Sequence, residues 1–123
     1  MEKMIAAFLG IVNYLKKSPD ITHVIILIMS VIIGVDIGGT QLRVASFPDE
    51  SNTPLKITRT LTHAVNEDVL ERLLSAVDAI WPHEPVSALS VACPGPLDPS
   101  LGIIYSTPNI PGWVNFPLRE KLE

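Results

Sequence analysis

The segment IGVDIGGTQLRVASF, residues Ile33–Phe47, constrains the fold of this chain more than any other stretch. Two apolar, partly β-branched runs flank a pair of adjacent glycines, which is the pattern of two strands joined by a tight turn. One carboxylate, Asp36, lies at the end of the first run. A connection this short favours antiparallel pairing, so the segment predicts a hairpin with an acid beside its turn.

The remaining periodicity predicts a mixed sheet with helices packed against it. The tight connections make the first three strands antiparallel, and a helix before the fourth strand indicates a crossover. The helix is expected to start at Asn66 as N-cap, with Glu67 and Asp68 in its first turn, and to stop before Pro82. The expected strands cover residues 31–36, 42–47, 56–62, 86–92 and, briefly, 103–105.

Composition excludes several classes of protein. A length of 123 residues suits one domain, and a net charge of −4 does not suit a nucleic-acid surface. The single cysteine, Cys93, excludes an internal disulfide and a zinc site built from cysteines, and it fits a reducing compartment. We therefore expect a cytoplasmic protein, with Cys93 acting as a small apolar residue rather than as a nucleophile.

Residues 1–30 form an N-terminal extension in this interpretation. A short helix is expected over Glu2–Leu15, and Met29 offers an alternative start, which would place residues 1–28 upstream of the domain. Residues 24–35 are apolar but, as a helix, would span only about 18 Å, less than the hydrocarbon core of a bilayer. A role at a membrane or in export is a less favoured alternative.

The glycine pair and its acid suggest a chemical purpose. Gly38 and Gly39 lack Cβ atoms, allow positive φ, and can present backbone amides to phosphate. Thr40 adds a hydroxyl donor, and Asp36 would hold Mg²⁺ directly or through water. An ordinary hairpin turn explains the spacing equally well, and neither the G-x-x-x-x-G-K-[ST] nor the G-x-G-x-x-G phosphate pattern is present.

A proline-rich stretch, VACPGPLDPSLGIIYSTPNIPGW, follows the fourth expected strand. Asn109 lies between two prolines, so its carboxamide is held on a stiff loop and could bind a sugar hydroxyl. The alternative is a proline-rich surface excursion with Trp113 filling the core, and for Trp113 this reading is favoured. Pro117 at a first helical position is expected to open the last helix.

These two motifs together resemble the ROK family of bacterial glucokinases, fructokinases and related sugar kinases and repressors. GVDIGGTQLRVA resembles the phosphate-binding segment of the family, and CPGPLDPSLGIIYSTPNIPGWVNFPLREKLE resembles the segment on the sugar side. The resemblance covers residues 31–123 and implies an α/β fold, the N-terminal lobe of a ribonuclease H-like or actin-like ATPase. It also implies ATP-dependent phosphorylation of a hexose, glucose being the first candidate.

Site residues carry over position by position. The resemblance places Asp36 on Mg²⁺, and it places Gly95 and Asn109 on the sugar. It implies contacts with the ATP phosphates from Gly38, Gly39, Thr40 and Gln41. Gln41 stands where many relatives have lysine, which weakens a cationic contact there, although Arg43 is near in sequence.

The catalytic base of the family is an aspartate in a Glu-Asn-Asp segment, and no segment of this chain matches it. The zinc motif and the C-terminal lobe of the family have no counterpart either. We expect very weak or no turnover from this chain alone. Asp98 is the nearest spare carboxylate, but its position favours a role in a turn.

Two further expectations follow from the unmatched parts. Uncovered apolar surface would favour self-association, or completion by a C-terminal lobe. The alternative to a kinase half is a non-catalytic module that binds nucleotide or sugar, or dimerises, and regulates a partner. A repressor fragment is disfavoured because residues 1–30 are not basic and leave no room for a winged helix-turn-helix.

Overall fold

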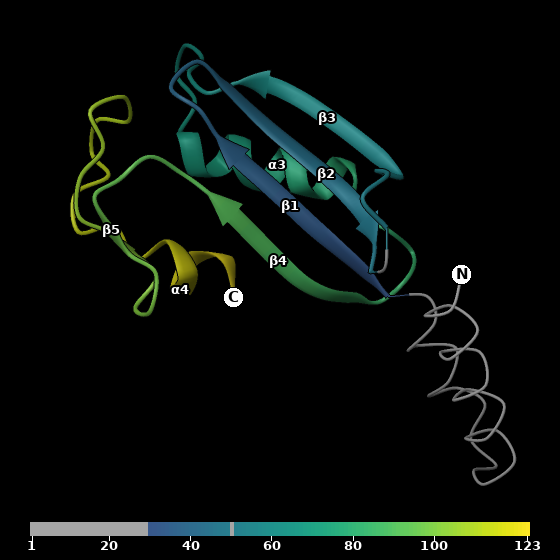
Figure 1. Ribbon diagram of the computed structural model, residues 1–123. Helices are drawn as coiled ribbons and strands as arrows, with labels where there is room; N and C mark the ends of the chain where they lie inside the picture. Colours follow the sequence, from purple (N-terminus) through teal and green to yellow (C-terminus); the bar gives the residue numbers. More distant parts are fainter. Residues whose placement is uncertain (1–29, 50) are drawn as a thin grey trace, which may run out of the picture.

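A computed structural model describes residues 30–49 and 51–123 and is built around a four-stranded sheet in the order β3-β2-β1-β4 (Figure 1). β1 pairs antiparallel with β2 and parallel with β4, and β2 pairs antiparallel with β3. The predicted mixed sheet with three antiparallel strands is thereby confirmed. The strands are β1 (Val31–Ile37), β2 (Gln41–Pro48), β3 (Lys56–Leu61) and β4 (Val86–Ala92).

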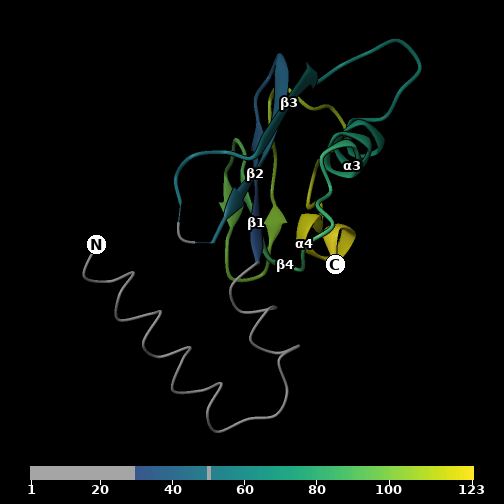
Figure 2. The ribbon, with the colours of Figure 1, turned by 90° about the vertical axis from the view of Figure 1, so that its right-hand side faces the viewer.

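Both helices of the described region lie on the same side of this sheet (Figure 2). Helix α3 (Val69–Ala79) connects β3 to β4, which makes the predicted crossover. A small antiparallel pair, β5 (Leu97–Asp98) with β6 (Ile103–Ile104), precedes the short C-terminal helix α4 (Leu118–Leu122). The opposite face of the sheet carries no helix within residues 30–49 and 51–123.

Alternation along β1 and β2 explains which face is covered. Successive side chains of a strand point to opposite faces, and one set on these two strands is buried beneath α3. Helix α3 contributes its own buried stripe to the same core. The core residues of the two strands and the helix are Val31, Ile33, Val35, Ile37, Leu42, Val44, Val69, Leu73, Ala76 and Val77.

The predicted start of α3 was wrong by two residues. Asn66 adopts a left-handed backbone with φ of 63°, which asparagine tolerates better than most residues but which cannot cap a helix. Asp68 is the N-cap, because its backbone is extended and its Oδ1 accepts a 2.7 Å hydrogen bond from the amide of Leu70. Two adjacent acids and an asparagine in a row left the cap position ambiguous in the sequence.

Other boundaries also moved slightly. β3 ends at Leu61, because Thr62 turns its side chain onto the β1–β2 connection. Pro117 is the N-cap of α4 rather than its first residue, and β5 was not predicted because two residues carry no periodicity.

The extension over residues 1–30, including the expected helix Glu2–Leu15, lies outside the described residues apart from Ser30. Among the described helices, none has the length and hydropathy needed to cross a membrane.

Candidate functional site

The turn between β1 and β2 is tight because the two glycines let the backbone approach closely. The amide of Gly38 donates a 2.9 Å hydrogen bond to the carbonyl of Gln41, and a Cβ on Gly38 would lie 2.9 Å from that same oxygen. Neither Gly38 nor Gly39 uses the positive φ that glycine permits, since among the described glycines only Gly102 and Gly112 have it. The glycines are therefore required by space rather than by backbone conformation.

Of the predicted phosphate donors, the amides at the tip of the turn are the ones available to a ligand. The amide of Gly38 already bonds Gln41, whereas within the described residues the amides of Gly39 and Thr40 donate to no backbone carbonyl. The side chains of Thr40 and Gln41 are exposed beside them. Two amides without a backbone acceptor, flanked by a hydroxyl and a carboxamide, are candidate donors to an anion.

Asn109 lies directly against this turn, although 70 residues separate it from Gly39. A Cβ placed on Gly39 would be 2.8 Å from Nδ2 of Asn109 and 3.0 Å from its Cγ, closer than real side chains allow. The loop is anchored beyond Asn109 by Ile110 and Trp113, which are both buried in the core. The prediction that Trp113 fills the core is confirmed, and the loop that carries Asn109 is anchored in the core just beyond this residue.

Asp36 lies on the helix-free face of the sheet, one residue before the last position of β1. Its side chain is 57% exposed, and its Oδ2 lies 3.8 Å from the guanidinium of Arg43, the cross-strand neighbour. At that separation the ion pair is not a close hydrogen bond, so the carboxylate oxygens remain free to bind a hydrated cation. No group of three or more His, Cys, Asp or Glu side chains in the described part of the chain forms a metal cage. A lone carboxylate of this kind suits Mg²⁺ that takes its other ligands from phosphates and water.

The segment after β4 contains three further residues that the sequence analysis discussed, Gly95, Asp98 and Cys93. A Cβ on Gly95 would lie 2.9 Å from the amide of Leu97, so this glycine is needed by the fold of its own segment. Asp98 forms a turn as expected, since its Oδ1 accepts hydrogen bonds from the amides of Ser100 at 2.8 Å and Leu101 at 3.0 Å. Cys93 is half-buried against the core, and burial raises the pKa of its thiol, which keeps it protonated and unreactive at neutral pH.

Sequence reasoning missed two residues that contact the site, Thr62 and His63. Thr62 is fully buried and its Oγ1 donates a 2.6 Å hydrogen bond to the carbonyl of Gly38. Nε2 of His63 lies 2.6 Å from the carbonyl oxygen of Asn109. The one available signal was that these two polar residues directly follow β3. It could be recognised only once the register of the sheet had placed the end of β3 beside the glycine turn.

Comparison with known proteins relates this chain to one family. A sequence model described as the ROK family matches residues 32–123. A glucokinase of Thermotoga maritima is 34% identical over 92 residues, and one of Streptomyces coelicolor is 32% identical over 95 residues. These alignments cover 74% and 77% of this chain, but in each case only 29% of the length of the relative.

Solved structures give the same relationship. A ROK family glucokinase from Streptomyces griseus, in complex with glucose and AMPPNP, superposes with a TM-score of 0.66 at 29% sequence identity. A ROK hexokinase from Thermus thermophilus superposes with a TM-score of 0.63 at 32% identity. Each superposition covers 76% of this chain, and 29% and 31% of the respective solved chain. The fold described above is thus shared with part of these larger structures.

Proposed function

This chain belongs to the ROK family, and we propose that its residues 31–123 form the N-terminal ATP- and sugar-binding half of a cytoplasmic hexose kinase, with glucose as the first candidate sugar. The contact between Gly39 and Asn109 is the observation that carries the proposal. It joins the turn with free amides to the loop that carries the Asn109 carboxamide, so donors for a phosphate and a contact for a sugar hydroxyl lie side by side.

On the nucleotide side, the amides of Gly39 and Thr40 would bind phosphate oxygens, with the Thr40 hydroxyl and the Gln41 side chain as neutral contacts. Asp36 would hold Mg²⁺, which when bound neutralises the phosphate charge that builds up during transfer. The absence of a lysine at position 41 leaves Arg43 as the nearest cation on β2, and Arg43 is engaged with Asp36. Phosphate binding would therefore depend mainly on backbone amides and on the metal.

On the sugar side, Asn109 would exchange hydrogen bonds with a sugar hydroxyl through its carboxamide. Gly95 would leave room for the sugar, as the family resemblance implies, while its close approach to Leu97 fixes the bend after β4. No carboxylate among the described residues occupies the role of a general base near Asn109, so we propose that this chain alone transfers phosphate very slowly or not at all. Completion by a C-terminal lobe would supply that base and exclude water.

Replacing Asp36 with alanine should abolish Mg²⁺-dependent binding of AMPPNP. The reason is that Asp36 supplies the protein ligand of the metal, so without it Mg²⁺ no longer connects the phosphates to the chain, even though Arg43 is released from its ion pair. Isothermal titration calorimetry of the 123-residue chain with AMPPNP, with and without Mg²⁺, measures the effect. Asp78→Ala removes an exposed acid from the end of α3 and serves as the matched control. An affinity equal to that of the unaltered chain would remove Asp36 from the site.

The same titration separates a kinase half from the other candidate role, a non-catalytic module that binds nucleotide or sugar, or dimerises, and regulates a partner. Heat with both Mg·AMPPNP and glucose supports a kinase half, since a kinase must hold both substrates at once. Heat with only one ligand supports the regulatory module. No heat with either ligand would contradict the proposed function.

We also propose that this chain associates with itself at tens of micromolar. One edge of β4 pairs with β1, while its other edge has no partner strand in the described residues, and its sequence VSALSVA carries no charge. Exposed Ile57 and Leu61 add apolar surface on β3. Size-exclusion chromatography with light scattering should give a mass above that of one chain, and Ser90→Lys on the free edge should lower it. A clean monomer before any substitution would contradict this proposal.

A further inference from the structure

Thr62 donates two hydrogen bonds to the turn that contains Gly38 and Gly39. Its Oγ1 donates to the carbonyl of Gly38 at 2.6 Å, and its amide donates to the carbonyl of Thr40 at 2.9 Å. The peptide between Gly38 and Gly39 is planar and trans, so its carbonyl and its N–H point in opposite directions. By holding the Gly38 carbonyl toward the interior, Thr62 turns the Gly39 amide outward, toward the space where a phosphate would sit.

His63 holds the other half of the site. Its Nε2 lies 2.6 Å from the carbonyl oxygen of Asn109, and because a carbonyl can only accept, Nε2 must carry the donated proton. This bond fixes the backbone of Asn109, while the side chain of the same residue packs against Gly39. Two consecutive residues thus bind two segments that are 70 positions apart in the sequence.

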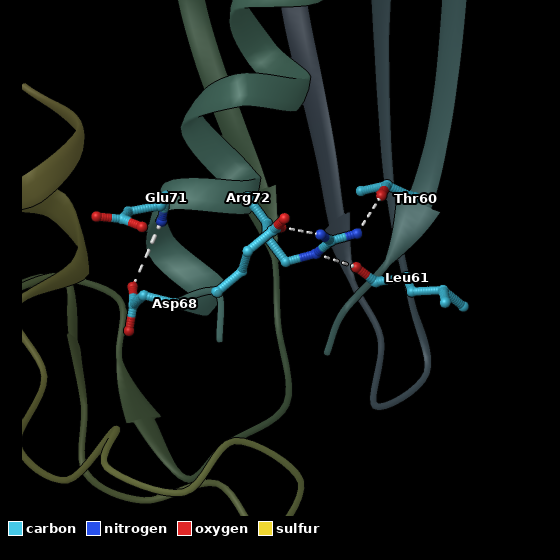
Figure 3. A network of polar contacts seen from close by, with 6 residues as sticks. Thr60, Leu61, Asp68, Glu71 and Arg72 are labelled. Atoms are coloured by element: carbon cyan, nitrogen blue, oxygen red, sulfur yellow. Dashed lines mark hydrogen bonds and ion pairs between the residues drawn. The ribbon is translucent and has the colours of Figure 1, made fainter. Parts of the chain in front are cut away.

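The end of β3, from which both residues follow, is itself fixed by α3 (Figure 3). Nε of Arg72 donates to the carbonyl of Leu61 at 2.8 Å, and its second terminal nitrogen donates to Oγ1 of Thr60 at 2.6 Å. Arg72 also forms an ion pair with Glu67, and its side chain is only 14% exposed. Because Arg72 is partly buried and makes several bonds, the last residues of β3 have little conformational freedom. Thr62 and His63, which follow them, are therefore held in position.

We propose that Thr62 and His63 are a positioning pair, which sets the distance between the phosphate-binding turn and the sugar-binding loop of the proposed kinase half. Neither side chain needs to touch a ligand for this role. Thr62 orients the amides at the tip of the turn, and His63 sets where the Asn109 carboxamide stands. The inference rests on the proposed function for its ligands, but the hydrogen bonds that it invokes can be tested without any ligand.

The ligand-free test is amide hydrogen exchange in the 123-residue chain. Thr62→Val keeps the β-branched shape but removes the hydroxyl bond, so exchange at the Gly38 amide should accelerate about tenfold. Thr62→Ser restores a hydroxyl and should return exchange at Gly38 toward its original rate. The amide of Val35, in the middle of β1, should be unaffected in both variants and reports on global unfolding. Equal acceleration at Gly38 and Val35 would show that Thr62 only stabilises the fold, which would overturn the proposal.

The ligand test uses calorimetry with Mg·AMPPNP and with glucose. Thr62→Val should weaken Mg·AMPPNP about tenfold and glucose less, whereas His63→Ala should weaken glucose about tenfold and Mg·AMPPNP less. His63→Gln keeps an N–H donor and should recover much of the glucose affinity. Equal losses of both ligands in both variants would overturn the division of roles. If the unaltered chain binds neither ligand while the exchange result holds, the proposed function fails and the positioning of the turn stands.

Discussion

Replacing Gly39 with alanine should weaken the binding of both glucose and Mg·AMPPNP about tenfold or more, with little loss of stability. The new Cβ would lie 2.8 Å from Nδ2 of Asn109, so the carboxamide must move away from the turn. Because the φ angle of Gly39 is not in the left-handed region, alanine can adopt the backbone conformation without strain. The exposed end of the Asn109 side chain can move aside. The substitution therefore displaces the carboxamide from the site and leaves the stability of the fold nearly unchanged.

Calorimetry with both ligands measures this loss, and urea unfolding checks that the fold survives. Gly34→Ala, on the strand β1 that leads into the turn, is the matched control, because a Cβ there would meet the ring of Phe47 at 3.4 Å, a distance at the edge of ordinary contact. The double variant Gly39→Ala with Asn109→Ala removes the clash and should recover part of the Mg·AMPPNP affinity but not the glucose affinity. Unchanged binding of both ligands by Gly39→Ala would mean that this contact is not part of the site.

The sheet could be predicted from sequence because its signals are local. Alternation along β1 and β2 identifies the buried face, and the uncharged run of β4 was predicted with its observed bounds, Val86–Ala92. The start of α3 could not be predicted as well, because Asn66 and Asp68 are both good caps and only the backbone conformation distinguishes them. The choice depends on where the preceding loop leaves β3, which is a tertiary property.

The candidate site was harder to predict from the sequence than the sheet, because its contacts join residues far apart in the chain. Sequence identified Gly39 and Asn109 through two separate motifs and attributed the glycines to close approach by a ligand, but it did not reveal that Asn109 itself packs against Gly39. That contact comes from a side chain 70 positions away, which no local pattern reveals. Thr62 and His63 were missed for a related reason, since their partners lie on the β1–β2 turn and on the proline-rich loop. The register of β2 against β3 places Thr62 beside the turn, and the path of the proline-rich loop brings Asn109 to His63.

Trp113 is the residue whose packing connects the core to the sugar-side loop. It is 4% exposed, and its ring stacks on Phe116 with centroids 4.4 Å apart and planes within 5°. Its amide donates to the carbonyl of Ile110, itself buried, which closes the loop just beyond Asn109. The indole thus fills space in the core beneath the loop, while the backbone amide of the same residue closes the loop.

Trp113→Ala should lower the free energy of unfolding by about 3–5 kcal/mol, because truncating a buried tryptophan leaves a large cavity and removes the stacked pair. A domain of this size has a total stability of about 5–15 kcal/mol, so a substantial unfolded population is expected. Urea unfolding followed by far-ultraviolet circular dichroism measures the change. Trp81→Ala, at the only other tryptophan of the chain, removes a half-exposed ring and should cost far less. Equal losses at the two positions would mean that Trp113 does not anchor the loop, and the placement of Asn109 would then need another cause.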